Sequence, residues 1–155
     1  MKYGAVAFAA PGKGAGLDIT PRKVLLVDDE PLVLSTISGL LADGGYEVIE
    51  ARGYEEALAR LEDAPDAGVL VTDISLGGAA DGLALAREAA RLRPGLRIVI
   101  VSGAVRPAGG ECPERAIFFT KPFAPGALLA IVGDGEAWAD VPDAQPSAGS
   151  VVTAA

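Results

Sequence analysis

Two apolar stretches of the chain each end in aspartates, and these carboxylates are the first candidates for chemistry. The run Val69 to Thr72 is followed by Asp73, and the run Val24 to Val27 is followed by Asp28 and Asp29. Short apolar runs of this kind are typical of strands buried on both faces of a parallel sheet. Because ligands bind beyond the carboxyl ends of such strands, we expect Asp28, Asp29 and Asp73 to meet at one edge of the sheet.

Three carboxylates held close together repel one another, and a cation can compensate them. Mg²⁺ accepts a few carboxylate oxygens together with backbone carbonyls and water, so this set predicts a magnesium site. An aspartate is also a nucleophile toward phosphorus that needs no base, provided that the charge of the transferred group is neutralised. Two further polar residues end apolar runs and are candidates for this task, the hydroxyl of Ser102 and the ammonium group of Lys121.

Strand and helix signals alternate along the chain between these residues. Strands are predicted at 23–27, 46–51, 68–73, 97–102 and 116–120, and helices at 31–44, 54–63, 81–93 and about 125–132. Strands that alternate with helices pair in parallel through right-handed crossovers. The predicted fold class is therefore α/β, a doubly wound sheet between two layers of helices.

The composition excludes several classes of function. The net charge of −8 argues against binding nucleic acid through a basic surface, and nothing indicates a membrane partner. The chain has no histidine and one cysteine, Cys112, which rules out disulfide frameworks, His/Cys metal sites and histidine-based triads. No stretch is long and apolar enough to span a membrane, and we expect a cytoplasmic protein.

The 155 residues are enough for one ordinary domain. We expect this domain at 22–133. Residues 1–21, rich in Gly and Ala, are expected to form a flexible leader, and residues 134–155, acidic and rich in Ala, Pro, Gly and Ser, a disordered tail.

Four motifs give the chain a resemblance to a known family. VLLVDDEP, VLVTD, VIVSG and FFTKPF, in this order and at these separations, resemble the receiver (response-regulator) domains of two-component signalling systems. The resemblance covers about residues 22–133. It implies a flavodoxin-like, five-stranded parallel sheet with the strand order 2-1-3-4-5.

The resemblance also assigns roles to the acidic residues. It makes Asp73 the phosphoacceptor and a ligand of Mg²⁺, and Asp29 a direct ligand of the same ion. Asp28 would act as a neighbour of the ion through water, and the backbone carbonyl of Ser75 would complete the ligands that the protein supplies.

Three other residues match positions of the family's switch. Ser102 takes the place of the switch Ser/Thr, and Lys121 that of the lysine that contacts the phosphoryl group. The bond between Lys121 and Pro122 would be cis. Phe118 takes the place of an aromatic residue that swings inward after phosphorylation.

The sequence departs from the family pattern in two segments. After Asp73, the loop is about one residue longer, and Leu76 is followed by Gly77 and Gly78 instead of the proline that the family usually has nearby. Between Ser102 and Lys121, where the family has its fourth helix, the chain reads GAVRPAGGECPER. Its prolines and glycines oppose helix formation, so we expect the fourth helix to be short or absent.

The predicted function is that of a stand-alone receiver, a signalling domain that is not an enzyme beyond its own phosphorylation and dephosphorylation. A histidine kinase or phosphotransfer protein would phosphorylate Asp73, and the added charge would switch binding to a downstream protein. The alternative is a pseudo-receiver, an interaction module that keeps the fold and signals without phosphate.

Two other classes fit less well. An aspartate-nucleophile phosphatase carries a second aspartate two residues after the nucleophile, where this chain has Ser75. A nucleotide- or flavin-binding module needs a glycine-rich phosphate loop after the first strand, and here acidic residues occupy that place.

Overall fold

The computed structural model describes residues 23–103, 113, 116–133 and 151–153. From Lys23 to Ser102 strands and helices alternate, as predicted. The strands are β1 (Lys23–Val27), β2 (Glu47–Ala51), β3 (Val69–Asp73), β4 (Arg97–Ser102), β5 (Ile117–Thr120) and β6 (Val151–Thr153). The helices are α2 (Pro31–Asp43), α3 (Tyr54–Asp63), α4 (Gly82–Leu92) and α5 (Pro125–Gly133).

The strands form one parallel sheet in the order β2-β1-β3-β4-β5-β6. The first five confirm the predicted order 2-1-3-4-5. In the register of β1 and β3, Val27 is the partner of Thr72. The residues that follow this pair, Asp28 and Asp73, therefore leave the sheet at the same level.

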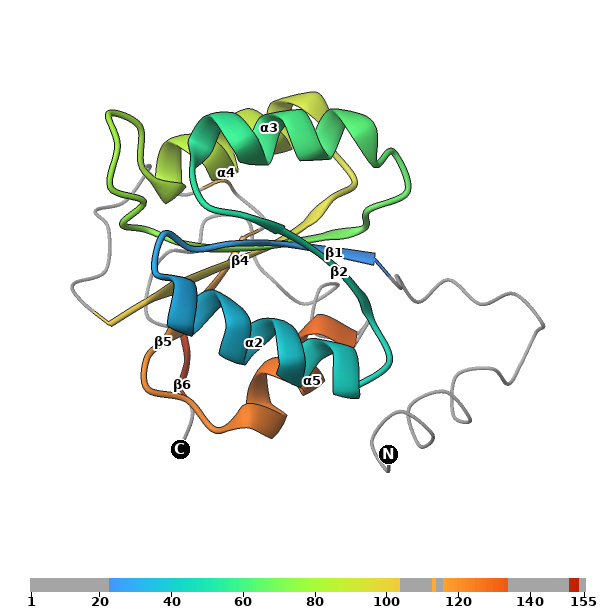
Figure 1. Cartoon of the computed structure of the whole chain (residues 1–155), viewed down its shortest axis with the longest axis vertical. Helices are drawn as coiled ribbons and strands as arrows, with labels where there is room; N and C mark the ends of the chain where they lie inside the picture. The colour runs from blue at the N-terminus through green and yellow to red at the C-terminus, as the bar shows by residue number, and fades with distance from the viewer. Residues whose placement is uncertain (1–22, 104–112, 114–115, 134–150, 154–155) are drawn as a thin grey trace.

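Helices cover both faces of the sheet (Figure 1). Helices α2 and α5 pack on one face, and α3 and α4 on the other. Alternate residues of the central strands point into the two cores, so that Leu26 and Val71 lie in one and Leu25 and Leu70 in the other. Both faces of β1 and β3 are thus buried, as their apolar sequences predict.

Local signals determine where the helices begin. Pro31 occupies the first turn of α2, where its missing N–H costs no hydrogen bond. The carboxylate of Asp81 accepts a hydrogen bond from the N–H of Ala84 at 2.9 Å and caps α4, as predicted.

One arginine links the two helices on the same face. The guanidinium of Arg93, just after α4, donates hydrogen bonds to the carbonyls of Ala67 at 3.0 Å, Ala64 at 2.9 Å and Leu61. These carbonyls lie at and beyond the end of α3. The arginine therefore joins the segments that precede β3 and β4 at the edge opposite the carboxylates.

Strand β6 was not predicted. It lies within residues 134–155, the segment expected to form a disordered tail, and the β-branched residues of Val151–Thr153 pair there with β5. The segment 1–21 lies outside the described residues.

Between β4 and β5 the structure describes Gly103, Pro113 and Ala116, and none of these is helical. No helix among the described residues is long and apolar enough to cross a membrane.

Candidate functional site

The end of β1 supplies two carboxylates. Asp28 is buried, and its Oδ1 accepts a hydrogen bond from the N–H of Glu30 at 2.9 Å. Its own N–H donates to the carbonyl of Ala51 on β2 at 3.2 Å. Asp29 is exposed. The turn into α2 thus fixes one carboxylate inside the molecule and leaves the next at the surface.

The end of β3 supplies the third carboxylate. Oδ1 of the half-buried Asp73 accepts a hydrogen bond from the N–H of Ile74 at 2.8 Å. The hydroxyl of Thr72 donates to the carbonyl of Asp73 at 2.9 Å. The contact with Ile74 shows that the start of the loop after β3 orients the Asp73 carboxylate.

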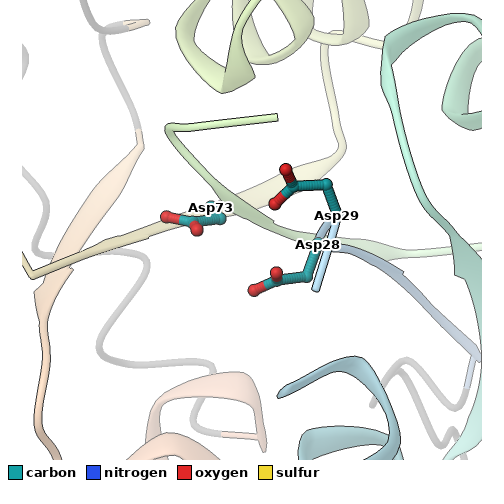
Figure 2. Close-up of side chains that lie close together, drawn as sticks. All are labelled: Asp28, Asp29 and Asp73. Atoms are coloured by element: carbon teal, nitrogen blue, oxygen red, sulfur yellow. The ribbon is translucent and has the colours of Figure 1, made fainter. Parts of the chain in front are cut away.

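The three aspartates form one cluster (Figure 2). Each of Asp28, Asp29 and Asp73 has a carboxylate oxygen within 4.8 Å of an oxygen of the other two. They come from two adjacent strands and gather in the space beyond the strand ends. Hard carboxylate oxygens in this number suit Mg²⁺, which takes its remaining ligands from carbonyls and water.

The electrostatics of the cluster favour a cation. Burial raises the pKa of Asp28 above its usual value, and the charges of Asp73 and Asp29 raise it further. The N–H of Glu30 and the ammonium group of Lys121 act in the opposite direction. A divalent ion would compensate the negative charge that remains.

Lys121 follows the end of β5 and completes the charged set. Its Nζ lies 3.6 Å from Oδ2 of Asp73, and its backbone N–H donates to the carbonyl of Ser102 at 2.9 Å. The peptide bond between Lys121 and Pro122 is cis, as the resemblance implies. The lysine is thus tied to β4 through its backbone and to β3 through its side chain.

A comparison with known families matches residues 24–133 to the response regulator receiver domain. The chain belongs to this family. Receiver domains are the signalling domains of response regulators in two-component systems and generally bind Mg²⁺ at an acidic pocket, and this chain has a cluster of three aspartates.

Relatives and solved structures agree with this assignment. The regulator PhyR of Methylorubrum extorquens is 29% identical over 111 residues, which are 71% of this chain and 42% of PhyR. A receiver protein from Sinorhizobium medicae is 28% identical with a TM-score of 0.64, covering 71% of this chain and 90% of that structure. A CheY-like receiver from Methanospirillum hungatei is 29% identical with a TM-score of 0.62, covering 72% and 90%. The chain spans less than half the length of the first curated relatives that it matches.

The other expected residues of the receiver site lie at different depths. Ser102 is buried at the end of β4, opposite Thr120 of β5 in the register. Phe118 is buried in the core beneath α3 and α4, beside Ala116 and Ile100. Ser75 is exposed in the loop after β3. The positions of these residues are compatible with the expected roles, and the roles themselves stay predictions.

Two glycines of the receiver site have roles that the sequence analysis missed. Gly77 has a φ of +75°, and a Cβ there would lie 2.8 Å from Oδ2 of Asp29. A Cβ at Gly82 would lie 1.8 Å from the carbonyl oxygen of Asp73. The glycine pair after Leu76 and the Asp-Gly pair before α4 were the available signals, because both dipeptides are typical of special backbone positions.

Proposed function

We propose that this receiver domain accepts a phosphoryl group on Asp73 and thereby switches its binding to other proteins. The observation that carries the proposal is the combination of the three-aspartate cluster with Lys121, whose Nζ lies 3.6 Å from Asp73 Oδ2. The half-buried carboxylate of Asp73 lies close to one cation and to two further carboxylates. That arrangement suits a nucleophile that must receive a group with several negative charges.

Asp28, Asp29, Asp73 and the carbonyl of Ser75 are the residues that would hold Mg²⁺. When bound, the ion would neutralise negative charge on the phosphoryl oxygens. The residues of the chain do the rest. The N–H of Ile74 holds Oδ1 of Asp73, and Oδ2 faces Lys121.

The transfer itself balances without a base. A carboxylate oxygen of Asp73 forms the new bond to phosphorus, while the bond from phosphorus to the donor's histidine nitrogen breaks and its electron pair remains on that nitrogen. Lys121 then pairs with the new phosphoryl oxygens, and the hydroxyl of Ser102 donates to them. Because Ser102 ends β4 and Lys121 follows β5, the added charge changes the surface beside these strands.

The phosphodonor is a histidine kinase or a histidine phosphotransfer protein, which must bind beside Asp73. Leu32, three residues after Asp29, is 79% exposed. An apolar side chain this accessible beside the site is a suitable contact for a protein donor. Leu32→Ser should therefore slow transfer from a phosphorylated histidine phosphotransfer protein and leave transfer from acetyl phosphate unchanged. Leu92→Ser, at a leucine that is 49% exposed at the end of α4, is the matched control.

The decisive experiment measures the mass of the intact protein after incubation with acetyl phosphate, with and without Mg²⁺. We expect the mass of one phosphoryl group to be added in the presence of Mg²⁺, and no addition in Asp73→Asn. Asp66→Asn is the matched control, because this exposed carboxylate pairs with Lys23 outside the site and its loss should leave the adduct intact.

The same protein tests the pseudo-receiver alternative. Beryllofluoride with Mg²⁺ imitates the phosphorylated aspartate without needing a reactive donor. If acetyl phosphate does not phosphorylate the wild-type protein and beryllofluoride does not bind to it, the proposed phosphorylation switch is wrong. The pseudo-receiver is then the better account of the protein.

A further inference from the structure

Strand β6 lies along the outer edge of β5 and runs parallel to it. The register pairs Phe118 with Val151, Phe119 with Val152 and Thr120 with Thr153. Every residue from Phe118 to the end of β5 thus has a partner on β6. The pairing stops next to Lys121, the residue that contacts Asp73.

The connection into β6 differs in hand from the other crossovers of the sheet. The β3-α4-β4 unit moves outward along the sheet with its helix on the α3/α4 face. The step from β5 to β6 moves in the same direction, but α5 lies on the opposite face, with α2 (Figure 1). A crossover through α5 therefore has the opposite hand to β3-α4-β4. Since crossovers between parallel strands are almost always right-handed, β6 is better explained as a strand added from outside than as a further βαβ unit.

The extent of the receiver family supports this view. The family match ends at residue 133, the end of α5, so β6 is not part of the family's fold. Residues 134–150 separate α5 from β6, and a chain of this length can extend about 55 Å. Without β6, the outer N–H and C=O groups of β5 would form an open edge, which is a template for pairing with another extended segment.

We propose that the outer edge of β5 is a binding site for an extended peptide segment, and that residues 151–153 occupy it in cis. The partner that fits is a segment of another protein that runs parallel to β5, is uncharged and is rich in β-branched residues, as the stretch SAGSVVTAA at 147–155 is. A three-residue strand makes few hydrogen bonds, so it exchanges readily with such a competitor. This inference does not depend on phosphorylation of Asp73.

The test uses the full chain with both Val151→Pro and Val152→Pro. The N–H groups of alternate residues in a strand point to the same neighbouring strand. One of two adjacent residues therefore donates to β5, and prolines at both positions remove that N–H in either case. We expect hydrogen exchange of the β5 amides to become at least tenfold faster. Ala154→Pro with Ala155→Pro is the matched control, because these residues follow the strand, and it should leave the exchange unchanged.

A labelled peptide SAGSVVTAA then tests the site directly. It should bind the Val151→Pro, Val152→Pro protein at least tenfold more tightly than the wild type, whose edge is occupied, and it should restore slow exchange in β5. The same peptide with the two prolines should not bind.

Two results would overturn the proposal. Equal exchange of the β5 amides in the wild type and the double-proline variant would mean that β6 does not occupy the edge in solution. Protection that increases with protein concentration would mean that a second copy supplies the strand, and the assignment in cis would be wrong.

Discussion

The ammonium nitrogen of Lys121 lies 3.6 Å from Oδ2 of Asp73, although 48 residues separate them in the chain. The two side chains are 29% and 15% exposed, so water screens this pair less than it screens a surface ion pair. Because Lys121 is the cation that faces the proposed phosphoacceptor, its loss should weaken the binding of any group that imitates phosphate there.

For Lys121→Met, we expect the affinity for beryllofluoride in the presence of Mg²⁺ to fall about tenfold or more, which corresponds to about 1.4 kcal/mol. Titration of the protein with beryllofluoride, followed by calorimetry, measures this affinity. The control is Lys23→Met, which removes a lysine paired with Asp66 at 2.8 Å away from the site. Equal affinities of the wild type and Lys121→Met would contradict the role of Lys121.

The buried carboxylate of Asp28 should cost stability when no metal is bound. Burial, followed by the charges of Asp73 and Asp29, raises the pKa of Asp28. The folded chain therefore binds this proton more readily than the unfolded chain. Proton binding to Asp28 therefore stabilises the folded chain. This stabilisation is complete at pH values below the pKa of Asp28 in the unfolded chain, and it is lost as the pH rises through the raised pKa of the folded chain.

Asp28→Asn should remove this pH dependence and stabilise the metal-free protein at neutral pH by about 1 kcal/mol. The amide oxygen can still accept the hydrogen bond from the N–H of Glu30. Urea unfolding in EDTA at several pH values measures the effect, and Mg²⁺ titration should show weaker binding. Asp66→Asn is a control with the opposite pH dependence. The hydrogen bond from Lys23 lowers the pKa of Asp66, so the stability that the ionised Asp66 contributes is lost as the pH falls. A variant with the same pH profile as the wild type would refute the assignment to Asp28.

Gly77 should be needed for both the loop and the metal site. Its φ of +75° strains any residue with a side chain, and a Cβ would lie 2.8 Å from Oδ2 of Asp29. We expect Gly77→Ala to cost about 1 kcal/mol of stability and to lower the affinity for Mg²⁺ by about tenfold, because the carboxylate of Asp29 must move.

The neighbouring glycine provides the control for this prediction. A Cβ at Gly78 meets nothing within 4 Å, so Gly78→Ala should change neither stability nor affinity. If both alanine variants bound Mg²⁺ equally well, the contact between Gly77 and Asp29 would have no part in the site.

The sheet and the acidic cluster could be predicted from the sequence because their signals are local. The apolar runs that end in Asp28 and Asp73 identify strands buried on both faces, and parallel pairing brings their ends to one edge. The cis bond before Pro122 and the placement of Lys121 came from the resemblance to receiver domains. Both are present in the structure.

The features that escaped prediction depend on contacts between distant segments. The sequence shows a glycine at position 77 but not that its α-carbon faces Asp29, 48 residues earlier. Strand β6 has only three residues, too few for a periodic pattern to distinguish it from a polar tail. Its position depends on the free edge of β5, which is known only once the order of the strands is known.

Gly82 forms a close backbone contact between the start of α4 and the end of β3. The N–H of Gly82 donates to the carbonyl of Ile74 at 2.7 Å, and a Cβ at Gly82 would lie 1.8 Å from the carbonyl oxygen of Asp73 and 2.9 Å from Cα of Ile74. All these neighbours are backbone atoms and cannot rotate away. Gly82→Ala must therefore shift either the helix or the backbone that carries Asp73, and we expect a loss of about 3 kcal/mol of stability.

Gly39→Ala separates this effect from a general response to alanine in a helix. Gly39 lies inside α2 with open space around its Cβ position, so the change should stabilise the protein by about 1 kcal/mol through helix propensity. Urea unfolding of both variants measures the two signs. Without urea, where Gly82→Ala should still be folded, its rate of phosphorylation by acetyl phosphate should also fall, because the displaced backbone carries the nucleophile. A destabilised variant with the wild-type rate would show that Gly82 supports the fold without positioning Asp73.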